Sequence, residues 1–156
     1  MMTDTRTRLI VLAAGGSAAL MLGALTFQHF GGLAPCKMCI WQRYPHVIAI
    51  VIGILAVRIK GATLPLLGAI AALTTANIGA YHTGVERKWW EGPASCTSAN
   101  GSDLTADEFF DAIMSAPVTR CDDVAWEMLG LSMASWNMVI SLGLMCLWLL
   151  AARNKA

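Results

Sequence analysis

Residues 9–30 read LIVLAAGGSAALMLGALTFQHF, a run that contains no Asp, Glu, Lys or Arg. A helix rises about 1.5 Å per residue, so about 20 residues are enough to cross the hydrocarbon core of a bilayer. A single apolar segment in lipid must satisfy its own backbone polar groups, and a helix is the structure that does so. This stretch therefore predicts a transmembrane helix.

Three further apolar stretches of comparable length follow, at 40–57, 63–83 and 131–152. Segments of about ten residues that alternate apolar and polar side chains, the mark of a transmembrane barrel, are absent from the sequence. A chain of 156 residues is long enough for one domain of ordinary size. The sequence predicts an all-α membrane protein, a four-transmembrane-helix bundle that forms a single domain over 1–156.

The composition agrees with a protein that lies in a bilayer. Hydrophobic residues make up 56% of the chain and charged residues 13%, about half the usual share. The 11 Lys and Arg nearly balance the 10 Asp and Glu, which excludes a basic nucleic-acid binder. No Gly-x-Gly-x-x-Gly motif lies between a strand and a helix, so we expect neither a nucleotide nor a flavin.

Charge orients the predicted bundle. Basic residues precede the first span, separate the second from the third and follow the fourth: Arg6, Arg8, Arg58, Lys60, Arg153 and Lys155. By contrast, the segment 84–130 carries three basic and nine acidic side chains. The positive-inside rule then predicts cytoplasmic termini and places the loops 31–39 and 84–130 outside.

A secretory signal is the alternative interpretation of the first span. Gly32-Leu33-Ala34 resembles a small-x-small cleavage site. The 22-residue apolar run before it exceeds the roughly 7–15 residues of a typical signal, and Pro35 would follow the cut. We therefore expect the first span to be retained.

Five cysteines are present, at positions 36, 39, 96, 121 and 146. The predicted topology places the first four outside the cytoplasm, where thiols tend to form disulfides. Two bridges are then expected, Cys36–Cys39 and Cys96–Cys121. Cys146 falls within the fourth span, where we expect a small packing residue.

Other roles for the cysteines must be weighed. A zinc site prefers two close pairs, but Cys96 and Cys121 lie 25 residues apart, and c-type haem attachment needs His where Ile40 stands, so no metal site is expected. A structural bridge worth about 3 kcal/mol explains Cys96–Cys121 equally well. Cys36-x-x-Cys39 closes almost no loop, which favours thiol–disulfide exchange over a structural role.

Cys39 stands where the second span begins, and the N-terminus of a helix carries about half a positive charge. Arg43 follows four residues later, on the same face of a helix. Both features favour a thiolate, the reactive form, at Cys39. Arg43 could instead anchor the helix at the interface by snorkelling. Pro45 either opens the regular helix or kinks one already under way.

Further polar side chains gather near the same membrane face. Gln28 and His29 end the first span, and His82 ends the third. Polar side chains at this depth usually face the bundle interior or water. Their convergence predicts a pocket beside the Cys36–Cys39 pair.

The acidic loop contains one predicted element. Thr105-Ala-Asp-Glu108 is a capping box, and Leu104 can pack on Phe109 as a hydrophobic staple. The pattern predicts a short interfacial helix over 106–115 that ends before Pro117. It lies flat on the outer leaflet or against the bundle, or it is a solvated loop helix.

Together these residues resemble the DsbB family, membrane enzymes that reoxidise the periplasmic thiol oxidase DsbA and pass electrons to quinone. The resemblance rests on four motifs: Phe27-Gln-His-Phe, Pro35-Cys-Lys-Met-Cys-Ile-Trp-Gln-Arg43, Tyr81-His82-Thr83, and Trp126-Glu-Met-Leu-Gly-Leu131 after the loop cysteine pair. It covers all four predicted spans and both outer loops.

The resemblance implies a role for each cysteine outside the spans. Cys96 would form a mixed disulfide with a periplasmic DsbA-like thiol oxidase. Cys121 would then exchange with Cys36, and Cys39 would be released as the thiolate that faces the quinone.

The resemblance also implies a quinone site in a bacterial inner-membrane protein that meets the lipid and the quinone pool. Arg43 would hold the quinone and stabilise negative charge, and His82 and Gln28 match polar positions near it. Family members often carry Glu where this chain has Gln42, so no carboxylate role is expected there. Whether ubiquinone or menaquinone is the acceptor does not follow from the sequence.

The sequence as a whole predicts a thiol:quinone oxidoreductase that sustains protein disulfide bond formation. A non-enzymatic membrane scaffold or assembly factor, with both bridges structural, is the alternative from another class. An enzyme that runs the reaction in reverse, with quinol reducing a periplasmic disulfide, also stays open.

Overall fold

The computed structural model describes residues 2–93, 96 and 120–154. Its elements are α1 (Met2–His29), α2 (Lys37–Arg58), α3 (Thr63–Glu86), β1 (Glu127–Met128), β2 (Leu131–Ser132) and α5 (Met133–Arg153). Each of these helices is long and apolar enough to cross a membrane. The predicted four-helix membrane bundle is confirmed, whereas the helix expected at 106–115 lies outside the described residues.

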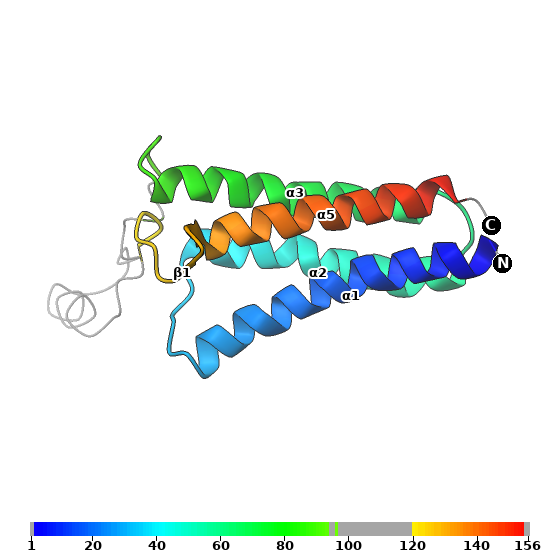
Figure 1. Cartoon of the computed structure of the whole chain (residues 1–156), viewed down its shortest axis with the longest axis horizontal. Helices are drawn as coiled ribbons and strands as arrows, with labels where there is room; N and C mark the ends of the chain where they lie inside the picture. Colours follow the sequence, from blue (N-terminus) through cyan, green and yellow to red (C-terminus); the bar gives the residue numbers. More distant parts are fainter. Residues whose placement is uncertain (1, 94–95, 97–119, 155–156) are drawn as a thin grey trace, which may run out of the picture.

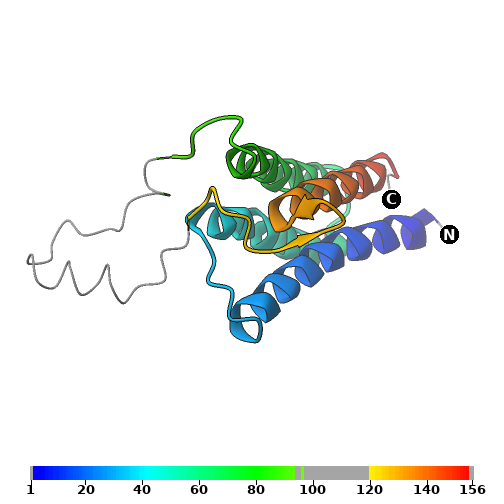
Figure 2. The ribbon, with the colours of Figure 1, turned by 60° about the vertical axis from the view of Figure 1, so that its left-hand side comes forward.

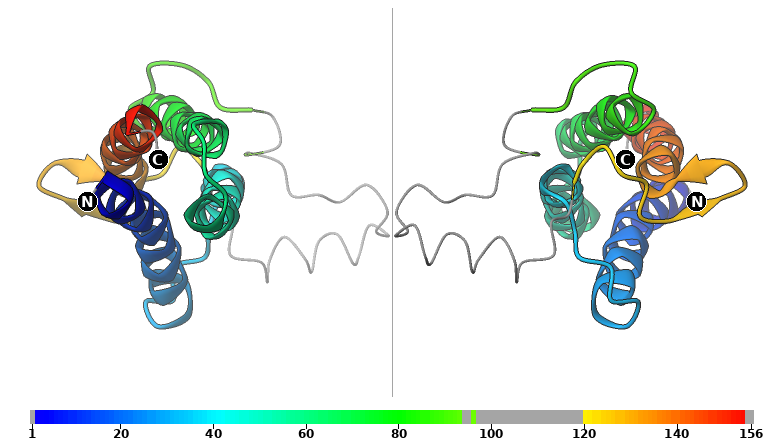
Figure 3. Two further views of the ribbon diagram at one scale, coloured as in Figure 1. Left: turned by 90° about the vertical axis from the view of Figure 1, so that its right-hand side faces the viewer. Right: turned by 90° about the vertical axis from the view of Figure 1, so that its left-hand side faces the viewer.

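The helices form a ring in which α1 packs against α2 and α5, and α3 packs against the same two neighbours (Figure 3). Both chain ends lie at one end of the bundle, as Figure 1 shows. The connection from α1 to α2 and the β1–β2 hairpin lie at the other end (Figure 2). Towards His29, α1 leans away from the remaining helices (Figure 1).

Two helix boundaries answer questions that the sequence left open. α2 begins at Lys37, so Pro45 lies inside a helix already under way. α5 begins at Met133, two residues after the approximate start of the predicted span, because Leu131 pairs with Met128 in the β1–β2 hairpin. Leu129 and Gly130 both have positive φ (55° and 76°), as a two-residue type I′ turn requires.

Small residues let the helices approach closely around one large side chain. Trp148 of α5 is fully buried in a cluster with five alanines, among them Ala56, Ala69 and Ala72. Lipid provides no hydrophobic driving force between helices. Small residues let the helix backbones approach closely, and the resulting van der Waals packing holds the helices together. Cys146, by contrast, is exposed on the outside of the bundle. Its expected packing role was wrong, because it points away from the core that its neighbour Trp148 fills.

A buried arginine fastens α1 to the end of α2. The Arg6 guanidinium is 3% exposed and donates to the backbone carbonyls of Ala56 at 3.0 Å, Ile59 at 3.3 Å and Gly61 at 2.9 Å. The last carbonyls of a helix have no partner within it, so the bond to Ala56 satisfies an acceptor that α2 leaves open. The other two bonds hold the turn that follows α2. The bundle is thus closed at the end where the chain termini lie.

Gly68 provides a test of this packing, because a Cβ at that position would come to 2.5 Å from Cδ2 of Trp148. We expect Gly68→Ala to lower the free energy of unfolding by about 1–3 kcal/mol, the usual cost of overpacking. Gly143→Ala is the matched control, since its Cβ would meet nothing within 4 Å. Thermal unfolding in detergent measures both variants, and equal melting temperatures would contradict the packing argument.

Candidate redox site

Cys36 and Cys39 lie at the N-terminus of α2. Cys36 is the N-cap residue, and its Sγ accepts a hydrogen bond from the Cys39 backbone N–H at 3.1 Å. Such a cap satisfies an N–H group that the first turn leaves without a helical partner. Both residues are free thiols with their Sγ atoms within 4.8 Å of one another, so the expected Cys36–Cys39 disulfide is not formed in this structure.

The second cysteine pair lies against the first. Cys96 and Cys121 form a disulfide, which agrees with the expected pairing. With Cys36, Met38 and Val85 they make up one buried apolar group, the cysteine cluster, and Cys39 packs against it. Residues far apart in sequence thus place both pairs at one end of the bundle, close enough for exchange chemistry between them to require only local movement.

The surroundings of Cys36 make its thiol hold its proton. Hydrogen bonding to the Cys39 side chain, and secondly burial, raise the pKa of Cys36 well above the ordinary thiol range. The thiolate is the nucleophile in thiol–disulfide exchange. In the reduced pair, Cys36 is therefore unreactive until its proton is removed.

His82 reaches the pair from α3. Its Nε2 lies 3.6 Å from Cys36 Sγ and 3.8 Å from Glu86 Oε1, and its Nδ1 lies 2.9 Å from Gln42 Nε2. The donor atoms of Cys36, Cys39 and His82 lie within 4.8 Å of one another, a set of sulfur and nitrogen ligands that could hold a thiophilic ion such as Zn²⁺. From the sequence alone, no metal site is expected at these residues.

Arg43 and Gln28 meet across the α1–α2 interface. The Arg43 guanidinium donates from Nη1 to Gln28 Oε1 at 2.7 Å. Because α2 already runs at Cys39, Arg43 follows one helical turn later, as the spacing predicts. His29 is exposed and stays apart from this group.

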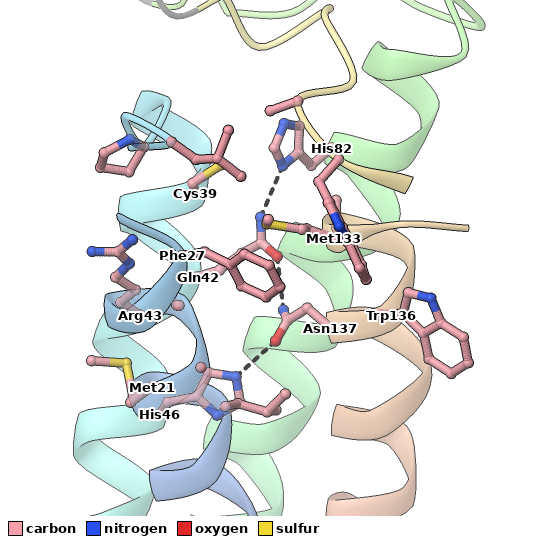
Figure 4. Close-up of a pocket in the computed structure, with 18 of the residues that line it drawn as sticks. Met21, Phe27, Cys39, Gln42, Arg43, His46, His82, Met133, Trp136 and Asn137 are labelled. Carbon is pink, nitrogen blue, oxygen red and sulfur yellow. Dashed lines mark hydrogen bonds between the residues drawn. The ribbon is translucent and has the colours of Figure 1, made fainter. Parts of the chain in front are cut away.

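A cavity of about 460 Å³ lies between α1, α2 and α5 beside these residues. Its walls are mostly apolar, including Leu20, Ala24, Phe27, Met133, Trp136 and Ile140. Polar and sulfur atoms enter it from Cys39, Gln42, Arg43, His46, His82 and Asn137 (Figure 4). Largely apolar cavities of about 300–1,000 Å³ with a few placed polar groups are typical small-molecule sites.

Several polar residues in and beside this cavity were not predicted from the sequence. His46 and Thr75 are buried, and Asn137 contacts both of them as well as Gln42. The spacing of Gln42 and His46, one turn apart in an apolar helix, was the available signal. Asn137 lies on a different helix far along the chain, so no local pattern could pair it with them.

Comparison with known proteins supports one family. Residues 6–151 match the family described as "Disulfide bond formation protein DsbB". A disulfide bond formation protein B from Verminephrobacter eiseniae is 33% identical over 173 residues, covering 97% of this chain and 93% of the relative. Proteins of the same name from Polaromonas naphthalenivorans and Stutzerimonas stutzeri are each 34% identical, covering 95% and 94% of this chain and 93% and 95% of the relatives. No solved structure matches the chain.

The raised pKa of Cys36 predicts a shifted alkylation profile. In the reduced protein we expect Cys36 to react with iodoacetamide only as pH rises above about 8.5, the ordinary thiol pKa, because the protonated thiol is unreactive. Mass spectrometry of the Cys36 peptide across pH gives the midpoint, with the unfolded chain as reference. A midpoint at or below that of the unfolded chain would contradict the prediction.

Proposed function

Because the chain belongs to the DsbB family of disulfide bond formation proteins, we propose that it oxidises a periplasmic dithiol and passes the electrons to membrane quinone. Family membership gives an oxidoreductase role in disulfide bond formation, and the four spanning helices make it a multi-pass membrane protein. The dithiol donor in this proposal is a thioredoxin-fold thiol oxidase similar to DsbA. The acceptor is ubiquinone or menaquinone.

The proposed electron path begins at the loop disulfide. A partner thiolate attacks the Cys96–Cys121 bridge at Cys96, which forms a mixed disulfide and releases Cys121 as a thiolate. Cys121 then attacks Cys36 of the oxidised pair and releases Cys39 as a thiolate. The second thiol of the partner displaces Cys96 from the mixed disulfide, which leaves the partner oxidised. Cys96 in turn displaces Cys36 from Cys121, which restores the loop bridge and leaves the Cys36–Cys39 pair reduced. Contact between both pairs in the cysteine cluster supports this order, since exchange requires sulfur atoms that can approach in line.

The acceptor fits the cavity between α1, α2 and α5. A quinone that takes two electrons and two protons becomes quinol, while two thiols become one disulfide. The apolar walls suit its ring, Cys39 lines the cavity at the donor end, and Arg43 supplies a fixed positive charge. Gln28 positions the Arg43 guanidinium through their 2.7 Å hydrogen bond. Charge that develops on a quinone oxygen is stabilised by a donor already held in place.

The orientation in the membrane is part of the proposal. The basic flanks place both termini in the cytoplasm of a bacterial cell, with the cysteine cluster at the periplasmic face of the inner membrane. The chain ends lie at one end of the bundle, and the N-terminus of α2, which carries Cys36 and Cys39, lies at the other; this supports the proposed orientation (Figure 1).

One observation carries the proposal: Cys36 belongs to the cysteine cluster, while Cys39, one turn away, lines the cavity. The Cys-x-x-Cys pair therefore joins a site for protein disulfides to a site for a small apolar molecule. A scaffold with two structural bridges gives no reason for the second site.

We expect Cys39→Ser to reduce quinone reduction to the uncatalysed rate, because Cys39 is the residue that brings a thiol to the cavity wall. The assay follows quinone absorbance with purified protein and a reduced thioredoxin-like dithiol. Cys146→Ser, at an exposed position in α5, is the control and should retain full turnover. Turnover that survives in Cys39→Ser, or a variant that simply loses its fold, would favour the scaffold.

Arg43→Ala should raise the KM for quinone by about tenfold or more, the scale of one hydrogen bond to a charged group. The KM for the dithiol partner should change much less, because Arg43 lies beside the cavity and not in the cysteine cluster. Arg58→Ala, at the other end of α2, is the matched control. An unchanged KM for quinone would return Arg43 to the role of interface anchor.

A further inference from the structure

A chain of buried and partly buried polar side chains connects α2, α3 and α5, and it begins at His82, whose Nε2 lies 3.6 Å from Cys36 Sγ. It runs from His82 to Gln42, then to Asn137 and to His46 (Figure 4). We call these four residues the polar chain. Imidazole and amide groups each have distinct donor and acceptor atoms, so the direction of every bond in such a chain is determined once one of them is fixed.

Backbone carbonyls fix the direction at Asn137. Its Nδ2 lies 3.0 Å from Thr75 Oγ1 and 3.5 Å from the Thr75 backbone oxygen. A backbone oxygen can only accept, so the NH₂ group of Asn137 faces Thr75. The Thr75 hydroxyl in turn donates to the backbone carbonyl oxygen of Gln42 at 3.0 Å. The lone pairs of Thr75 Oγ1 are then available to accept from Asn137.

The same logic orients Gln42. Its Nε2 lies 3.3 Å from the Met38 backbone oxygen, which again can only accept. Its Oε1 accepts from Asn137 Nδ2 at 2.8 Å. A reversed Gln42 amide would bring oxygen against oxygen at Met38 and NH₂ against NH₂ at Asn137. Gln42 therefore donates to His82 Nδ1, at 2.9 Å.

This donation decides which nitrogen of His82 carries the proton. A nitrogen that accepts a hydrogen bond has a lone pair, so in the neutral ring the proton lies on Nε2. Nε2 faces the Cys36 sulfur at 3.6 Å and Glu86 Oε1 at 3.8 Å, and the ring also makes a hydrogen bond to the backbone of Cys121. His82 thus presents an N–H group, and no lone pair, to the redox pair.

We propose that Gln42 and Asn137 are positioning residues that hold His82 as a hydrogen-bond donor to Cys36, so that His82 acts neither as a base nor as a metal ligand. The arrangement of the ring stands on the contacts alone, and its effect on turnover rests on the proposed function. Among the residues that the structure describes, the recorded partner of His82 Nδ1 is the Gln42 amide, and the carboxylate of Glu86 lies on the Nε2 side.

The proposal assigns the protons of the redox step. When the reduced pair is reoxidised, Cys36 and Cys39 each lose a proton and together lose two electrons as the S–S bond forms. The quinone takes up two electrons and two protons. Because Nε2 of His82 already bears a hydrogen, neither proton passes through that nitrogen, and its N–H stabilises negative charge on Cys36 sulfur.

The same tautomer disfavours a metal ion at Cys36, Cys39 and His82. A ligating imidazole binds through a lone pair and donates its other N–H to an acceptor such as a carboxylate. Gln42 offers His82 a donor on that side, the opposite of what a metal site needs. A glutamate at position 42 would supply the acceptor.

The direct test is ¹⁵N NMR of histidine-labelled, reduced, full-length protein in detergent micelles. In the wild type we expect a one-bond proton coupling at Nε2 of His82 and none at Nδ1. In Gln42→Glu the carboxylate accepts from the ring, so the coupling should appear at Nδ1. Thr74→Val is the control, because Thr74 is exposed and bonds within its own helix, and it should leave the His82 spectrum unchanged.

Two chemical measurements accompany the spectrum. The titratable groups around Cys36 are Cys39 on α2 and His82 and Glu86 on α3. A carboxylate on the Nδ1 side turns His82 into a base, so Gln42→Glu should lower the alkylation midpoint of Cys36 by about one pH unit or more. The variant should also bind Cd²⁺ at least tenfold more tightly, measured by thiolate absorbance of the reduced protein.

These measurements need neither quinone nor partner, so they separate this inference from the proposed function. A wild-type coupling at Nδ1 of His82 would overturn the inference even if the enzyme reduced quinone normally. Conversely, if the spectrum were as expected but the protein did not reduce quinone, the tautomer assignment would stand and the proposed electron path would be refuted. Should Gln42→Glu fail to fold, the wild-type spectrum alone decides, and Gln42→Leu should give a mixture of tautomers.

Discussion

A polar side chain inside a membrane bundle finds no water, so its partners must come from the other helices. This constraint shapes the molecule from end to end. At the terminal end Arg6 satisfies backbone carbonyls of α2 and its following turn. At the cysteine end Gln42 and Asn137 tie three helices together beside the redox pair. Removing one member would leave a buried donor or acceptor unpaired, which costs more than the lost bond itself. The polar residues therefore fix how the helices are placed, while the apolar ones set how closely they pack.

The placement of the cysteines follows from where α2 begins. Cys36 caps the helix and Cys39 lies in its first turn, so one sulfur belongs to the cysteine cluster and the other to the cavity. The positive end of the helix dipole lies at both. A cap residue is held by the helix it starts, and this gives the pair a rigid base on which sulfur exchange can take place.

Much of this arrangement can be predicted from the sequence, and physical reasons also explain which parts cannot. Hydropathy and length suffice for the four spans, because the bilayer sets a length that any crossing helix must meet. The four-residue spacing of Arg43 from Cys39 predicts that the two share a helix face, and both side chains line the cavity. Hydropathy places the start of α5 only to within two residues, since Leu131 is as apolar as the helix that follows and its pairing with Met128 assigns it to a strand. Cys146 was misjudged for a similar reason, as one residue's rotation about a helix decides whether it meets Trp148 or lipid.

The tautomer of His82 depends on contacts between residues 95 positions apart, which no local pattern contains.

The segment that follows the loop disulfide connects the two halves of the site. Cys121 lies in the cysteine cluster, and Trp126 packs on Phe27 of α1 with ring centroids 5.1 Å apart. Both aromatic side chains line the cavity, at the place where α1 leans away from the bundle (Figure 1). The five-residue step from Cys121 to Trp126 therefore joins the cysteine cluster directly to the wall of the cavity. The proposed function requires the protein disulfide and the small-molecule site to lie close together, and the fold meets this requirement with one short segment that has a residue in each.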